Sequence, residues 1–321
     1  MFRVALRRAG QAVPLLVGLT LLAFLILHLA PGDPAALLYG GELTGDELRR
    51  FRAQWGLDRP LPVQYLTWLA NLARGDFGRS YADGRPVLEV IAERIPATLV
   101  LTVSASLLAW GVGSLLGFTA AARAGSALDH ANRVAATVLY AIPNFWLGLL
   151  LIIAFSVRLG WLPTAGMETL GAGFSLVDRL RHLLLPVAVL AVRELGACMR
   201  FARASLLERL GAGYVRTARA KGLPEGRVIR RHALRNALIP LVSLIGLAVP
   251  RLLGGAVVVE TVFAWPGLGR LGVEAALARN YAVLMGNIVV AGILVLVGSL
   301  AADLAYAWLD PRIRQQMEAG G

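Results

Sequence analysis

The most basic part of the chain is residues 214–240, with the sequence YVRTARAKGLPEGRVIRRHALRNALIP. It holds seven Lys or Arg side chains and a single acid, Glu225. In its second half, arginines recur at i, i+4 and i+8 on one face of a helix, while apolar side chains lie mostly to the other side. The basic face holds Arg227, Arg231 and Arg235, and the apolar side holds Val228, Ile229 and Ala233. The pattern predicts an element that rests on apolar neighbours and binds a partner through its basic face.

The middle of this segment carries helix-ending and helix-starting residues. Gly222 can adopt the left-handed conformation that ends a helix, and Pro224 suits the first position of the next one. The alternative is a plain loop whose positive charge only fixes the orientation of the neighbouring membrane spans. Such a loop needs no helical pattern, so two short helices that meet at Gly222 favour a docking element.

Charged residues inside apolar runs form a second group of candidates. Arg193, Glu194 and Arg251 fall within such runs, where an isolated charge costs about 2.5–3.5 kcal/mol even on a lenient scale. Glu194 and Arg251 lie at similar depths, and we expect them to meet, either to fix helix packing or to line a polar path. Arg193 points about 100° away from Glu194 and faces something else. Asn144, beside Pro143, is the fourth candidate for a translocation path.

Several kinds of chemistry are excluded. Lys221 is the only lysine and follows Ala220, so the Gly-Lys-Ser/Thr end of a phosphate-binding loop is absent and any such ATPase must be another chain. Cys198 is the only cysteine, which excludes an intrachain disulfide. The four histidines lack metal-ligand spacing, and no hydrolase motif occurs. We therefore expect no metal, no cofactor, no catalytic residue and no enzyme activity in this chain.

The elements that position these residues are membrane spans. The chain is 57% hydrophobic and 16% charged, with a mean hydropathy of +0.65, whereas soluble domains carry about 25% charged residues. Six apolar runs approach or exceed the roughly 20 residues of a spanning helix: 9–30, 97–122, 134–157, 183–199, 236–259 and 282–302. The first is too long for a signal-peptide core, so we expect a retained span. The fold class is thus all-α with six transmembrane helices, the third, fourth and fifth broken at Pro143, Pro186 and Pro250.

Residues 31–96 have the composition of a soluble segment. A capping box at Thr44 and Glu47, and a helix opened by Pro62 and closed by Gly75, predict two or three short helices. The expected organisation is an N-terminal span (1–30), a small helical extracytoplasmic insert (31–96), a five-helix core (97–310) and a tail (311–321). The core includes a cytoplasmic loop at 208–236.

Positive charge sets the expected orientation. The segments on the side of the two termini hold seventeen Lys or Arg residues, and the short loops on the other side hold five. Since Lys and Arg concentrate in cytoplasmic loops, both termini and residues 214–240 are expected in the cytoplasm, within reach of soluble ATPases.

Nine short motifs follow one another along nearly the whole chain: PGDP, GDFGRS, RIPATLVLT, IPNFWLG, LGWLPTAGM, ARAKG, HALRNALIP, ETVFAWPGLGRL and DPRIR. Because these motifs occur in this order and at this spacing, the chain resembles the inner-membrane permease subunit of bacterial peptide-type ABC importers, the dipeptide, oligopeptide and nickel group. The resemblance implies the type I importer permease fold in the bacterial inner membrane. It also implies a second homologous permease subunit in a heterodimer, two ATPase subunits that bind ATP and Mg, and an extracytoplasmic substrate-binding protein. No nucleic acid is expected as a partner.

In such importers a cytoplasmic loop, the EAA loop, docks into a cleft of the ATPase. Aligning its Glu-Ala-Ala-x-x-x-Gly motif on Gly222 puts Arg216 at the Glu position and Thr217 and Ala218 at the two Ala positions, so that only Ala218 and Gly222 match. The resemblance implies ATPase coupling through Tyr214, Arg216, Thr217, Ala218, Lys221, Gly222, Leu223, Pro224 and Arg227.

The function expected from these residues is ATP-driven import of peptides or similar small solutes. An ion-coupled secondary transporter or channel is the alternative, because such carriers also use charged residues in spans. A membrane scaffold without transport is a third class. The substrate stays open among dipeptides, oligopeptides, nickel complexes and glutathione-like molecules.

Overall fold

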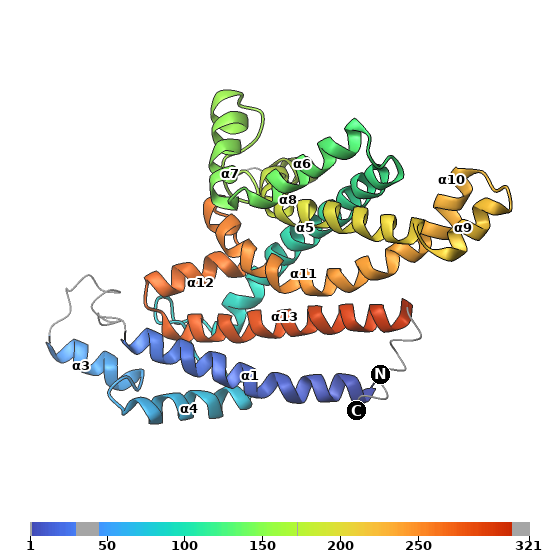
Figure 1. Cartoon of the computed structure of the whole chain (residues 1–321). Helices are drawn as coiled ribbons and strands as arrows, with labels where there is room; N and C mark the ends of the chain where they lie inside the picture. The colour runs from blue at the N-terminus through green and yellow to red at the C-terminus, as the bar shows by residue number, and fades with distance from the viewer. Residues whose placement is uncertain (1, 30–44, 172, 310–321) are drawn as a thin grey trace. The chain divides into compact units, whose positions relative to one another are not determined.

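A computed structural model describes residues 2–29, 45–171 and 173–309 of the protein. These residues form helices and one isolated β-bridge, between Arg79 and Pro86, and no strand occurs among them (Figure 1). The chain divides into two units. We call residues 1–5, 99–265 and 297–321 the loop-bearing unit, and residues 6–98 and 266–296 the insert-bearing unit.

The described residues of the predicted apolar runs fall on helices, apart from a break at Ile142 and Pro143. Among the described residues, α5 (Val87–Ala122), α8 (Leu176–Leu210) and the Tyr281–Ala301 part of α13 (Tyr281–Leu309) are each long and apolar enough to cross a membrane. The pair of α6 and α7 with η1 gives a fourth if it is counted as one span. Shorter apolar stretches lie in α1 (Phe2–Leu29), at Val13–Leu29, and in α11 (Leu234–Val262), at Leu252–Val262.

The loop-bearing unit is built around α8. Besides α8 and α11 it contains most of α5, α6 (Ala127–Ala141), α7 (Asn144–Leu151), the π-helix η1 (Ile152–Arg158), α9 (Gly213–Ala220), α10 (Glu225–Arg227) and the π-helix η2 (Val228–Ala233). Helices α6, α7 and α11 all pack on α8. At Gly117 of α5, an added Cβ would lie 2.5 Å from the backbone oxygen of Met199, so the backbones of α5 and α8 touch there. This close packing makes α8 the helix through which the parts of the unit are connected.

The third predicted span is bent more sharply than the sequence suggested. Helix α6 ends at Ala141, α7 begins at Asn144, and their axes differ by 99°. Ile142 and Pro143 between them are extended, with ψ of 126° and 130°. Pro143 has no N–H to donate and disfavours helical geometry in the residue before it, so the break at Pro143 is confirmed.

The breaks predicted at Pro186 and Pro250 were wrong. Helix α8 runs without interruption through Pro186 from Leu176 to Leu210, well beyond the predicted 183–199, and α11 runs through Pro250. Each proline removes one hydrogen bond, but the bonds of a long helix on either side keep the backbone helical. Pro186 is also buried in the packing of α8, which holds the helix in place.

The insert-bearing unit joins the soluble-like segment to apolar helices. It contains most of α1, α3 (Gly45–Gln54), α4 (Leu61–Ala73), the start of α5, α12 (Leu268–Leu277) and the start of α13. Pro62 lies in the first turn of α4 and Gly75 follows its end with φ of +83°, as predicted. The predicted capping residue Thr44 lies outside the described residues.

Side chains from distant parts of the sequence build the core of this unit. Val87 and Ile91 of α5 pack with Leu268 and Leu271 of α12. The hydroxyl groups of Thr20 in α1 and Tyr65 in α4 are 3.0 Å apart and both are buried. Tyr65 also packs with Phe24 and Met285, so the short helix α4 packs with the apolar helices α1 and α13.

Candidate functional site

The basic segment forms a sharp turn between two helical arms. Helix α9 ends at Ala220, and α10 begins at Glu225 and continues through η2 into α11. Gly222 has φ of +74°, the left-handed conformation predicted for it, and its N–H donates to the Arg219 oxygen over 2.9 Å. Pro224 directly precedes the second arm, in the N-cap position. An added Cβ at Gly222 would meet no atom within 4 Å, so backbone conformation, not space, requires glycine here.

One side of the turn is anchored in an apolar cluster. Val215 and Ala218 of α9 are buried together with Val228 of η2 and with Leu206 of α8. Leu223, at the turn itself, packs on the same cluster half-buried. The cluster also contains Ala121, Ala233 and Ala237. Because α5, α8, α9, η2 and α11 all contribute to it, the turn is a packed element and not a loose loop.

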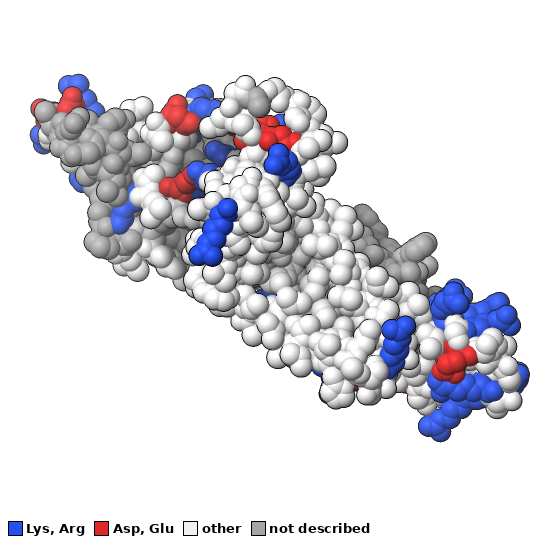
Figure 2. All heavy atoms as spheres, turned by 90° about the horizontal axis from the view of Figure 1, so that it is seen from above, with Lys and Arg blue, Asp and Glu red and all other residues white. Residues whose placement is uncertain are grey.

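The other side of the turn is basic and exposed. Figure 2 shows a dense group of Lys and Arg side chains around a small acidic patch, on the side of the view where Figure 1 places α9 and α10. The exposed cationic residues of the segment are Arg216, Arg219, Lys221, Arg227, Arg230, Arg231 and Arg235. Burial thus confirms the predicted separation of a basic face from an apolar face.

An ion pair closes the turn. Arg219 donates from Nε and Nη2 to the two carboxylate oxygens of Glu225, over 3.0 and 2.6 Å, and from Nη1 to the Leu210 oxygen over 3.4 Å. The hydrogen bonds and charge of Arg219 lower the pKa of Glu225, and those of Glu225 raise the pKa of Arg219. The pair connects both arms, and the Leu210 contact connects the turn to the end of α8.

A polar contact joins the first arm to α11. Asn236 donates from Nδ2 to the Tyr214 hydroxyl over 3.2 Å and to the His232 oxygen over 3.0 Å. Above it, the Ser205 hydroxyl of α8 donates to the Ala237 oxygen of α11 over 2.9 Å. The turn is therefore tied by contacts to both α8 and α11.

The comparisons with known proteins match nearly the whole length of the chain. Residues 1–102 match the family described as the N-terminal part of binding-protein-dependent transport system membrane components, and residues 113–315 match the inner membrane component of the same systems. The chain belongs to this family of transport permeases.

Two relatives that are named as peptide transport permeases are similar to this chain over nearly its whole length. It is 44% identical over 309 residues to the oligopeptide transport system permease protein AppB of Bacillus subtilis (strain 168), covering 96% of this chain and 98% of that protein. It is 40% identical over 333 residues to the di/tripeptide transport system permease protein DppB of Pseudomonas aeruginosa (strain UCBPP-PA14), covering 97% and 98%. The predicted family resemblance is confirmed.

A solved structure confirms the fold class. The permease matches a chain of the MetNI methionine ABC transporter, solved in an inward facing conformation, with a TM-score of 0.56 over 70% of this chain and 97% of that one. Sequence identity is 20%, so the match bears on the fold alone, which is that of an ABC importer permease.

The residues predicted for coupling lie together on the turn of the permease, in two environments. Tyr214, Arg216, Thr217, Lys221 and Arg227 are exposed, as are Gly222 and Pro224. Ala218 is buried and Leu223 half-buried, so these two hold the turn in place and do not face outward. Arg219, Glu225 and Asn236 also belong to the site, although they were not among the residues predicted for coupling; Glu225, the only acid in a basic segment, was the sequence signal for the first two.

The residues predicted for a translocation path lie on α7, α8 and α11 of the loop-bearing unit. Asn144 begins α7, and its Oδ1 is buried with no hydrogen-bond partner among the described residues. Arg193 is exposed on α8, whereas Glu194 is buried. The side chain of Arg251 lies outside the described residues, so the pairing of Glu194 with Arg251 stays a prediction.

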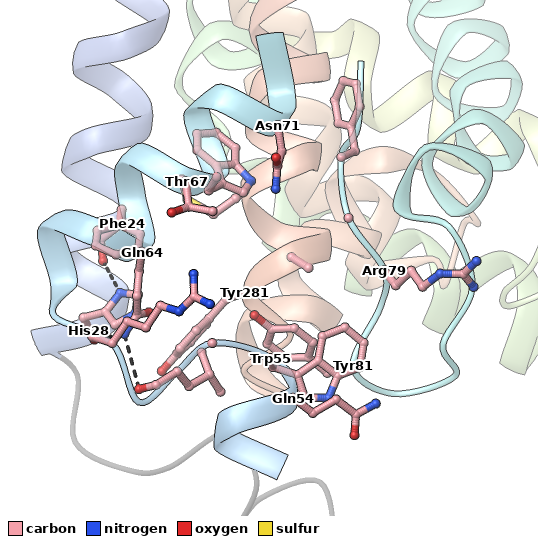
Figure 3. Close-up of a pocket in the computed structure, with 18 of the residues that line it drawn as sticks. Phe24, His28, Gln54, Trp55, Gln64, Thr67, Asn71, Arg79, Tyr81 and Tyr281 are labelled. Atoms are coloured by element: carbon pink, nitrogen blue, oxygen red, sulfur yellow. Dashed lines mark hydrogen bonds between the residues drawn. The ribbon is translucent and has the colours of Figure 1, made fainter. Parts of the chain in front are cut away.

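The insert-bearing unit of the permease contains a pocket of about 350 Å³ (Figure 3). Aromatic rings from α1, α4, α13 and the segment after α4 line it, and Figure 3 shows the rings of Tyr281 and Tyr81 near each other, with their centroids 6.4 Å apart, together with the amide side chains of Gln64 and Asn71. The pocket is suited to an apolar or amphipathic group. It contains none of the residues predicted from the sequence for coupling or for the path.

The described part of the permease does not meet the usual requirements of a metal site. There, no group of three or more His, Cys, Asp or Glu residues is placed to hold a metal ion. The family to which the chain belongs is one of transport permeases.

Proposed function

We propose that this chain is the transmembrane subunit through which peptides or similar small solutes enter the cell, and that ATP hydrolysis on separate subunits drives the movement. The observation that carries the proposal is the packed, basic turn of α9, α10 and η2 in a chain of this permease family. The names of the relatives, which specify oligopeptides and di/tripeptides, support peptides as the substrate class. No observation favours the alternative of an ion-coupled transporter.

The partners follow from the same proposal. A second homologous permease completes the path, two ATP-binding cassette subunits bind ATP and Mg, and an extracytoplasmic binding protein delivers the solute. The basic face of the turn, with the exposed Arg216, Lys221 and Arg227, meets the ATPase in the cytoplasm, and both termini lie on that side. The positive charge concentrated in residues 200–235 supports this orientation.

The contacts of the turn suggest how the energy is transmitted. The first arm is fixed to the end of α8 through Leu206 and the Leu210 oxygen, and to α11 through Tyr214 and Asn236. The second arm continues into α11 without a break. When the ATPases close on nucleotide, a displaced turn moves α8 and α11 together and switches the side on which the path is open.

The test is a reconstituted complex with its ATPases and binding protein, comparing the Gly222→Val and Gly160→Val variants. Both glycines have positive φ (+74° and +64°) and no atom within 4 Å of an added Cβ, so both substitutions impose the same kind of backbone strain. Only Gly222 lies in the basic turn. We expect Gly222→Val to lower ATP-dependent peptide uptake and peptide-stimulated ATP hydrolysis at least fivefold, with subunits still assembled, and Gly160→Val to remain close to wild type.

Two outcomes would contradict the proposal. Unchanged uptake in Gly222→Val would show that the turn does not couple the two processes. Peptide uptake by the chain without ATPases would establish the secondary transporter instead.

A further inference from the structure

Two arginines of α8 share one aromatic ring of α6. The guanidinium carbon of Arg193 lies 5.2 Å from the ring centroid of Tyr140, and that of Arg200 lies 4.3 Å from the same centroid. The sum of these two distances, 9.5 Å, is the largest separation that the two carbons can have. The arrangement brings two like charges close together on one surface of the loop-bearing unit.

Helix packing explains how the ring comes near both arginines. Arg193, Gly196 and Arg200 follow one another at i, i+3 and i+7, the spacing of one helix face. A Cβ added at Gly196 would lie 2.6 Å from the Ala136 oxygen and 2.9 Å from the Tyr140 nitrogen, so the backbone of α6 rests directly on α8 at this glycine. The Tyr140 side chain therefore leaves α6 at the level of the two arginines.

Both guanidinium groups are available to an anion. Arg193 and Arg200 are exposed, Tyr140 is 39% exposed, and within the described part of the chain neither arginine forms an ion pair. Stacking over a ring occupies the face of a guanidinium and leaves its N–H donors, which lie in its plane, free for a planar carboxylate. The ring thus orients the two groups without neutralising them.

Their location restricts what this anion can be. Arg193 lies within the apolar run 183–199, and charges within spanning helices face a protein interior or a water-filled path. Glu194 is buried in α8, about 100° around the helix axis, so the nearest acid along the chain is turned inward. A mobile carboxylate passing along the surface of α8 would meet both guanidinium groups in succession.

We propose that Arg193, Arg200 and Tyr140 form a carboxylate-binding site on the translocation path, which receives the free C-terminal carboxylate of a transported peptide. The inference rests on the proposed function and adds to it the chemical group that the path recognises. The two arginines bind the carboxylate through bidentate hydrogen bonds, and Tyr140 positions them. Because both arginines lie near one ring, the carboxylate passes from one to the other without being released into an apolar region.

The experiment uses the complete complex in proteoliposomes, with trialanine and its C-terminal amide as probes. The double variant Arg193→Gln/Arg200→Gln should lower trialanine uptake at least tenfold, while ATP hydrolysis stimulated by the loaded binding protein changes less than twofold. Uptake of the amide should change less than twofold, because it has no carboxylate. Arg200→Lys and Tyr140→Phe should each retain more trialanine uptake than Arg200→Gln, and the control Arg158→Gln, at an exposed arginine at the end of η1, should match wild type.

The outcomes separate this inference from the proposed function. If the wild-type complex takes up no peptide, the proposed function fails. If wild type transports trialanine and the double variant does so equally well, or if uptake of the amide falls in parallel, the carboxylate site is refuted. Loss of the second permease subunit from the purified double variant would assign the arginines to the interface between subunits, and would also overturn the inference.

Discussion

Arg203 of α8 donates from Nε and Nη2 to the two carboxylate oxygens of Asp129 in α6, over 2.5 and 2.8 Å. The Asp129 side chain is 2% exposed and also accepts the N–H of Gly125 over 3.0 Å. This buried ion pair fixes the first turn of α6 to α8, a short distance along α8 from the basic turn. It connects the bent third span to the helix on which the whole unit is built.

Asp129→Asn should destabilise the permease by about 1–3 kcal/mol, because it leaves the guanidinium of Arg203, which is 22% exposed, without its counter-charge. The measurement is unfolding in detergent micelles, followed by the loss of helical signal. The control is Asp46→Asn, which breaks the pair of Asp46 with Arg49, whose side chains are 76% and 80% exposed. Exposed pairs contribute about 0–1 kcal/mol, so equal effects of the two variants would contradict the structural role given to Asp129.

The Asp129–Arg203 pair also shows where sequence reasoning stops. The apolar runs, the turn at Gly222 and the two faces of the second arm were predictable, because each depends on residue types at short, regular spacing. Asp129 and Arg203 are 74 residues apart, and nothing local in either segment indicates the partner. The same holds for Tyr140 with Arg193 and Arg200, which only the packing at Gly196 brings together.

The proline breaks illustrate a second limit. Pro143 and Pro186 give the same local signal, yet the chain bends by 99° at the first and stays helical at the second. What differs is tertiary packing, since Pro186 is buried within α8 whereas Pro143 lies at an exposed junction. A proline removes a hydrogen bond wherever it occurs, but its neighbours decide whether the helix continues.

The pair of Arg219 and Glu225 predicts a dependence on pH. Arg219 lowers the pKa of Glu225 below its ordinary value of about 4.3. The stabilisation of the turn is therefore complete above the ordinary value and is lost as the pH falls through the lowered one. Hydrogen exchange of the amides of residues 219–227 should be slower in wild type than in Glu225→Gln at neutral pH. The difference between the two proteins should vanish in acid, and a difference that persists there would contradict this role of the pair.

The apolar side of the turn predicts a contrast between neighbouring residues. Ala218 is 6% exposed in the cluster with Leu206 and Val228, whereas Thr217 is exposed. Ala218→Glu would bury an unpaired charge and release α9, while Thr217→Glu would not. Trypsin cleaves the segment when the turn opens locally, and a loss of about 1.4 kcal/mol in the stability of the turn raises the open population about tenfold. Trypsin should therefore cleave the segment at least roughly tenfold faster in Ala218→Glu than in Thr217→Glu. Equal cleavage of the two variants would show that the turn is not held by this cluster.

The contact of α6 with α8 at Gly196 predicts that even one methyl group is too large. A Cβ there would lie 2.6 Å from the Ala136 oxygen, closer than any tolerated contact, and this oxygen belongs to backbone that can yield only if α6 shifts. Gly196→Ala should therefore destabilise the permease by about 1–3 kcal/mol, the usual effect of overpacking. The matched control is Gly254→Ala in α11, where an added Cβ meets nothing within 4 Å. Because alanine forms helices better than glycine by about 1 kcal/mol, the control should unfold at the same denaturant concentration as wild type or a higher one. If Gly196→Ala behaves like Gly254→Ala, α6 does not rest on α8 at this glycine, and the position of Tyr140 near the two arginines loses its support.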